Sequence, residues 1–86
     1  MDEPRRRQAA RERISVGELP SVSPTRIWIH DATWEVCAVC REEITESTSE
    51  YELQFDLLFG LGRTELVSFW FHPLCLAAWL VERGAE

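Results

Sequence analysis

The chain has 86 residues, a formal net charge of −6, nine arginines without any lysine, and three cysteines. This length allows one small domain with a thin core, so a disulfide, a metal or a partner subunit is expected to stabilise it. An odd number of cysteines cannot form a closed set of intrachain disulfides, which disfavours a secreted disulfide scaffold and favours a metal site in a reducing compartment.

Composition also restricts the location and the source of the protein. No apolar run is long enough to span a membrane, and no apolar stretch follows the basic N-terminus, so we expect a cytoplasmic protein that does not contact membranes. We interpret the exclusive use of arginine as the codon bias of a GC-rich, bacterial genome. Selection against lysine modification is the alternative.

The charges divide the chain into two parts. Residues 1–26 carry six arginines against four acids, whereas residues 27–86 carry three arginines against eleven acids. Gly17, Pro20 and Pro24 interrupt regular structure in the first part. We therefore predict a flexible arginine-rich arm and linker over 1–26, with a transient helix at its start, and an acidic folded domain over 27–86.

The second part predicts strands followed by a helix. It begins with the β-prone run Ile27-Trp28-Ile29, and later apolar and polar residues alternate over 50–57 as in a half-buried strand. Two glycines in 59–63 supply a turn, and the β-branched and aromatic run over 64–71 supplies the return strand of a hairpin. From Pro73 the period becomes helical, with an apolar face of Leu76, Trp79, Leu80 and the stem of Arg83, and with Gly84 suited to the cap.

A histidine and a cysteine lie where this helix begins. Proline is favoured at the first helical position, which places Pro73 there, His72 at the cap and Cys75 in the first turn. Side chains at these two positions lie close together, and the positive end of the helix dipole is expected to lower the pKa of the Cys75 thiol.

Cys37 and Cys40 have the two-residue spacing that a tight turn, or zinc knuckle, presents to a metal ion. Together with His72 and Cys75 they make a tetrahedral set that uses every cysteine. Three thiolates and one imidazole select zinc, and four protein ligands leave no position for water, so we predict one structural Zn²⁺. For the second histidine, His30, we favour a surface or loop position over a role as a further ligand.

A knuckle, a hairpin, and a helix that supplies the last two ligands resemble the treble-clef zinc finger, an α+β fold. The Cys-x2-Cys and His-x2-Cys pairs, Ile44, and the run "FWF" before His72 are similar to the finger of poly(ADP-ribose) polymerases and, more distantly, to half of a LIM domain. The likeness covers roughly residues 34 to 80, and its spacer between the pairs is longer than is usual in those fingers. The resemblance implies a zinc-stabilised treble clef with the ligand set given above.

Three functions follow as hypotheses. We expect a protein-interaction or adaptor module, with a homodimer as one form of this idea, because apolar residues crowd the hairpin tip. The candidate contacts are Leu57, Leu58, Phe59, Leu61 and Arg63. The alternative is a nucleic-acid-binding finger that uses Arg5, Arg6, Arg7, Arg11 and Arg13, although an acidic domain repels phosphate. A closed zinc site disfavours catalysis, so we expect neither an enzyme nor a small-molecule substrate.

Overall fold

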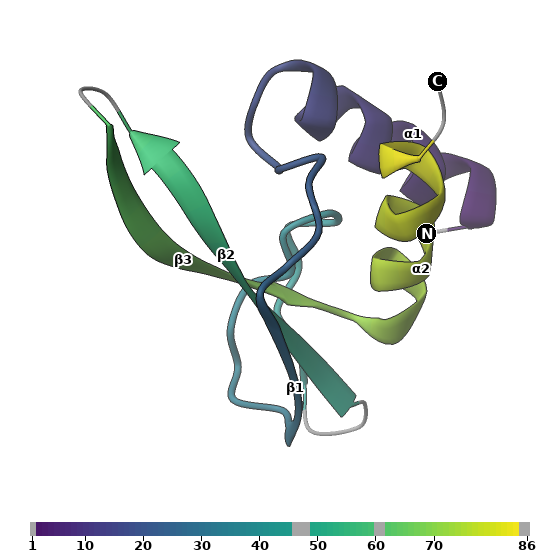
Figure 1. The fold of residues 1–86 in the computed structure, drawn as a ribbon. Coiled ribbons are helices and arrows are strands. Elements are labelled where there is room, and N and C mark those ends of the chain that lie inside the picture. Colours follow the sequence, from purple (N-terminus) through teal and green to yellow (C-terminus); the bar gives the residue numbers. More distant parts are fainter. Residues whose placement is uncertain (1, 46–48, 60–61, 85–86) are drawn as a thin grey trace.

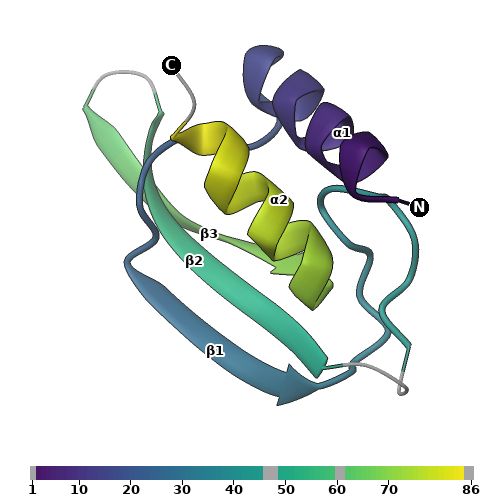
Figure 2. The same cartoon turned by 90° about the vertical axis from the view of Figure 1, so that its right-hand side faces the viewer.

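The computed structural model describes residues 2–45, 49–59 and 62–84. In chain order its elements are α1 (Glu3–Ser15), β1 (Arg26–Asp31), β2 (Ser49–Phe59), β3 (Arg63–Phe71) and α2 (Pro73–Arg83). The strands form one antiparallel sheet in the order β1-β2-β3. Helix α2 lies across one face of this sheet and α1 packs beside α2 (Figures 1 and 2). The expected α+β class is confirmed.

The hairpin forms where the alternating pattern predicts it. Leu53 and Phe55 of β2 are fully buried on the face covered by α2, while Gln54 and Asp56 point to the opposite face. Successive side chains of a strand point to opposite sides of a sheet, so the alternation in the sequence becomes one apolar and one polar face. The predicted run at 27–29 is the centre of β1, which pairs with β2.

Helix α2 begins and ends at the predicted residues, but its buried face differs from the prediction. Pro73 begins the helix and Gly84 follows its last residue. The buried positions are Cys75, Ala78, Trp79 and Glu82, whereas Leu80 is 46% exposed. The reason is that α1 packs against one flank of α2, so the covered face includes the side of Ala78 and Glu82 instead of the side of Leu80.

Trp79 is the centre of the core. Its ring lies 5.7 Å from the ring of Phe55 and 5.8 Å from that of Phe71, measured between centroids. Its indole N–H donates a 2.8 Å hydrogen bond to the carbonyl of Pro20, and the Arg83 guanidinium lies 4.9 Å from the ring centre. One side chain therefore joins α2 to the hairpin and to the segment that links α1 with β1.

Residues 1–26, for which we predicted an arm with a helix at its start, contain α1, and this helix packs against α2. Residues 3–15 form α1, whose start is capped by Asp2 through a 3.0 Å hydrogen bond from the Arg5 N–H. Only Ala10 of this helix is buried. A helix that docks through a small side chain carries little apolar periodicity, which is why the sequence pattern did not predict a packed element.

Two ion pairs hold α1 on α2. Glu82 of α2 accepts from Nε of Arg7 and from Nε of Arg11, at 2.8 Å each, and its side chain is only 2% exposed. The two arginines are four residues apart and thus lie on one face of α1. Both pairs lower the pKa of Glu82, and Arg11 contributes most.

Among the described residues, no helix is both long and apolar enough to cross a membrane.

We predict that Glu82→Gln releases α1 from the domain without unfolding the sheet, because the variant removes the charge that both arginines contact. Amide hydrogen exchange should accelerate in residues 3–15 and stay slow in β2. Since the folded state lowers the pKa of Glu82, its stabilising effect is present at neutral pH and is lost as the pH falls through that lowered value. Acidification should therefore release α1 in the wild type and change little in Glu82→Gln.

The matched control is Glu12→Gln on the exposed face of α1, where the Glu12 carboxylate accepts from the Gln8 side chain at 3.1 Å. This variant should keep the slow exchange of α1. Equal exchange of α1 amides in wild type and Glu82→Gln would contradict the role assigned to Glu82.

Candidate metal centre

Cys37 and Cys40 lie in a tight turn closed by backbone hydrogen bonds. The Arg41 N–H donates to the Cys37 carbonyl at 3.0 Å, and the Cys37 N–H donates to the Glu42 carbonyl at 2.9 Å. Arg41 has a φ of 67°, in the left-handed region, where the chain reverses after the second cysteine. The two-residue spacing therefore produces the knuckle that the sequence predicts.

This knuckle is fixed to the sheet and to α1. Cys37 forms a bridge with Trp70 of β3, and the Ala38 N–H donates to the Trp70 carbonyl at 2.8 Å. Val39, between the two cysteines, is fully buried, and its carbonyl accepts a 2.9 Å hydrogen bond from Arg13 of α1. The knuckle thus lies against the end of β3, directly before the residues that begin α2.

The other two candidate ligands lie at the start of α2, as predicted. His72 is the N-cap residue with extended backbone, its carbonyl accepts from the Leu76 N–H at 2.9 Å, and its side chain makes no capping hydrogen bond. The imidazole instead turns toward the knuckle, with Nδ1 3.3 Å from Sγ of Cys40. Cys75, one turn into the helix, is 3% exposed.

The four side chains converge on one point. One donor atom from each of Cys37, Cys40, His72 and Cys75 lies within 4.8 Å of every other. In a tetrahedral zinc site with Zn–S bonds of about 2.3 Å, neighbouring sulfurs lie about 3.8 Å apart, so small movements would complete the coordination. The cluster can hold a metal ion, and its three sulfurs and one nitrogen suit zinc.

The protonation states of the thiols also fit a cation. A hydrogen bond from Cys75 lowers the pKa of Cys37 to about 4, against the effect of burial. The same interaction raises the pKa of Cys75, and burial raises that of Cys40. In the metal-free cluster the Cys37 thiolate therefore raises the pKa of Cys75, which is opposite to the direction expected from the helix dipole. Three thiolates this close together need a divalent cation between them, which deprotonates its thiol ligands outright.

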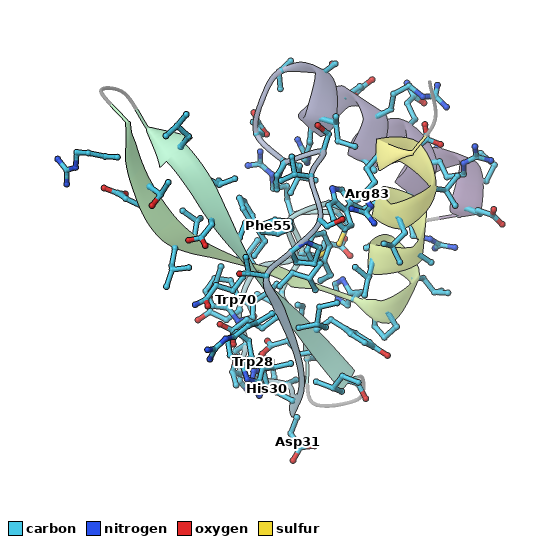
Figure 3. The ribbon with its side chains drawn as sticks, in the orientation of Figure 1. Trp28, His30, Asp31, Phe55, Trp70 and Arg83 are labelled. Carbon is cyan, nitrogen blue, oxygen red and sulfur yellow. The ribbon has the colours of Figure 1, made fainter. Side chains whose placement is uncertain are left out.

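His30 lies on the sheet, away from this cluster. Its Nε2 is 2.8 Å from Oε1 of Glu52, a residue of the neighbouring strand β2. Figure 3 shows His30 beside Trp28 and Trp70, on the side of the sheet opposite α2. It is not among the four clustered donors.

The residues proposed as partner contacts differ in their exposure to solvent. Leu57 is partly buried against the core, whereas Leu58 is 71% exposed. Arg63 is exposed and lies 3.8 Å from Glu65. Leu61 and the side chain of Phe59 lie outside the described part of the chain. Leu58 and Arg63 thus remain accessible near the hairpin tip.

The arginines proposed for nucleic acid have other contacts. Arg7 and Arg11 bind Glu82, and Arg13 contacts the knuckle and Glu18. Arg5 is exposed, and Arg6 lines a hollow of about 300 Å³ together with Cys40 and His72. Intramolecular pairing therefore occupies at least three of the five side chains in the described structure.

Sequence reasoning missed two supports of the site. One is the contact of Arg13 with the knuckle. The signal for it lies at residues 2–4, where an aspartate cap and a proline in the first turn predict a stable α1. The other is Glu50, fully buried at the start of β2, whose carboxylate accepts from Oγ1 of Thr33 at 2.9 Å. This contact ties the loop that leads to the knuckle to the sheet, and the alternating pattern had placed Glu50 on a solvent-exposed face.

We predict that His72→Ala weakens zinc binding by much more than the roughly 10- to 100-fold cost of losing an outer-shell contact. The reason is that the variant removes one of four converging donors. Competition with a chromophoric chelator measures the affinity, and circular dichroism reports folding. The matched variant His30→Ala should bind zinc like the wild type, and equal zinc affinities of the two variants would contradict the assignment of His72.

No family model, curated protein or solved structure gives a significant match to this chain.

Proposed function

We propose that the protein is a treble-clef zinc finger whose single Zn²⁺ is structural and whose activity is binding another protein. The cluster of Cys37, Cys40, His72 and Cys75 carries this proposal. The order of knuckle, hairpin β2–β3 and helix α2 supports the treble clef, because the ligands come from the knuckle and from the first turn of the helix. Zinc would supply folding free energy on the order of 10 kcal/mol, as in other small zinc domains.

A catalytic role is disfavoured by the donor set. Four protein ligands complete a tetrahedron, so no coordination position is left for a reacting water. Zinc coordination would also occupy all three thiols, which removes the nucleophile that a thiol oxidoreductase requires. We therefore infer a binding protein instead of an enzyme.

Exposed apolar side chains favour a protein partner. Ile27, Ile29 and Leu58 are 57%, 65% and 71% exposed, and exposed apolar side chains that lie together mark interaction sites. The chain is acidic, and its arginines of α1 are largely paired with carboxylates. These features support a protein surface over the phosphate backbone of a nucleic acid.

We predict that native mass spectrometry finds one zinc per chain, and that a thiol-reactive dye modifies no cysteine rapidly until a chelator is added. Chelation should expose three reactive thiols and abolish the folded circular dichroism signal together, because the metal holds the knuckle on α2. A folded, zinc-free protein with reactive thiols would contradict the proposal and support a redox role for Cys37 and Cys40.

A second prediction separates protein from nucleic acid as the partner. Fluorescence anisotropy with single- and double-stranded oligonucleotides should show only weak binding that disappears as salt rises, because few arginines are available for phosphate contacts. Tight, salt-dependent binding that Arg5→Ala weakens would favour the nucleic-acid alternative.

A further inference from the structure

The two edges of the sheet are protected differently. On the β3 side, the knuckle covers the strand end, with Cys37 bridging Trp70 and the Ala38 N–H donating to the Trp70 carbonyl. On the other side, β1 has β2 as its partner along one edge, and no described element lies beside its outer edge (Figures 1 and 2). An open edge strand presents unpaired backbone groups that can bind another strand.

The centre of β1 lacks the usual protections of an open edge, since the charged residues Arg26 and Asp31 lie at its two ends. Such edges are commonly shielded by lysine, proline, a bulge or an inward-pointing charge. The strand reads RIWIHD, pairs with β2 in a continuous register over all six residues, and exposes Ile27 and Ile29 on the α2 side of the sheet. The edge is therefore regular, β-prone and apolar at its centre.

Helix α2 widens this apolar surface. The helical period places Leu76 and Leu80 on the flank of α2 that is opposite α1, on the side of the helix nearer β1 (Figure 2). Leu80 is 46% exposed, and Leu76 is partly buried. These two side chains lie on the same side of the sheet as Ile27 and Ile29, and we call the four residues the β1 edge surface.

We propose that the β1 edge surface binds a second copy of this chain, with the two β1 strands antiparallel and a continuous six-stranded sheet across the dimer. The inference rests on the proposed function and names its partner. It differs from dimerisation through the hairpin tip, the interface that the sequence suggests.

Symmetry and side-chain chemistry together select one register for this pair. A two-fold axis perpendicular to the sheet makes the α2 face of one chain continuous with the α2 face of the other. A residue of β1 can therefore lie opposite only those partner residues whose numbers differ from its own by an even number or by zero. With Trp28 on the axis, it faces the partner's Trp28 on the sheet face opposite α2. Ile27 of each chain then faces the partner's Ile29, which buries both pairs on the α2 side of the joined sheet.

The charged side chains on and beside β1 favour the same register. Arg26 faces the partner's His30, and in each chain the His30 imidazole contacts the Glu52 carboxylate at 2.8 Å. The guanidinium therefore approaches a histidine–carboxylate pair and not a second cation alone. Shifting the register by two residues, so that Ile29 lies on the axis, would place Ile27 opposite the partner's Asp31, which disfavours that alternative.

The net charge of the chain predicts how dimerisation depends on salt concentration. Each chain carries a formal charge of −6, so two copies repel one another at low ionic strength. Salt screens this repulsion. Dimerisation should therefore strengthen as salt rises, which is opposite to the behaviour of nucleic-acid binding.

Sedimentation velocity of the zinc-loaded protein over a concentration series tests the dimer. The wild type should show a reversible monomer–dimer equilibrium, and Ile27→Asp or Ile29→Lys should each raise the dimer dissociation constant by about tenfold or more, because symmetry doubles every change. Leu58→Lys is the matched control, since Leu58 is equally exposed but lies near the hairpin tip. It should leave the equilibrium unchanged.

Mixing the two edge variants tests the register. In a mixed dimer the new carboxylate faces the new ammonium and the remaining isoleucines face each other, so Ile27→Asp with Ile29→Lys should restore dimers that neither variant forms alone. A wild type that stays monomeric at all concentrations and salts would overturn the proposal, as would loss of dimer in Leu58→Lys but not in Ile29→Lys. Native mass spectrometry of the same samples counts zinc, so one zinc per monomeric chain would overturn the dimer while leaving the zinc proposal intact.

Discussion

The convergence of four donor side chains on one point is the constraint on which the rest of this small fold depends. Cys37 and Cys40 lie on a knuckle, His72 and Cys75 lie at the start of α2, and the whole hairpin separates the two pairs in the sequence. A domain of this size buries too little apolar surface to hold such distant segments together through its core alone. A metal bound there would cross-link both ends of the hairpin and set the position of α2 on the sheet.

Other contacts act in support of that constraint. Trp79 fills the space between α2 and the hairpin and also binds the linker, while Arg13 and Glu82 attach α1 to the knuckle and to α2. Each of these contacts connects an element to one of the two segments that carry the donors. The N-terminal helix is thus part of the scaffold around the candidate site, and three of its five arginines make contacts that hold it there.

Much of this arrangement could be predicted from the sequence. The alternation along β2, the proline that begins α2, and the spacing of the cysteine and histidine pairs are local patterns that depend on few neighbours. The docking of α1 could not be predicted in this way, because it depends on Glu82, more than seventy residues away, and on one buried alanine. Burial of Glu50 escaped prediction for a similar reason, since Thr33 supplies its hydrogen bonds from a loop without periodicity.

The most direct measurement of the central claim is X-ray absorption spectroscopy at the zinc edge of the purified protein. We expect a four-coordinate shell of three sulfur atoms at about 2.3 Å and one nitrogen atom at about 2.0 Å. That result would identify the cluster of Cys37, Cys40, His72 and Cys75 as the site. A shell with fewer than three sulfurs, or with an added oxygen from water, would contradict a closed structural centre.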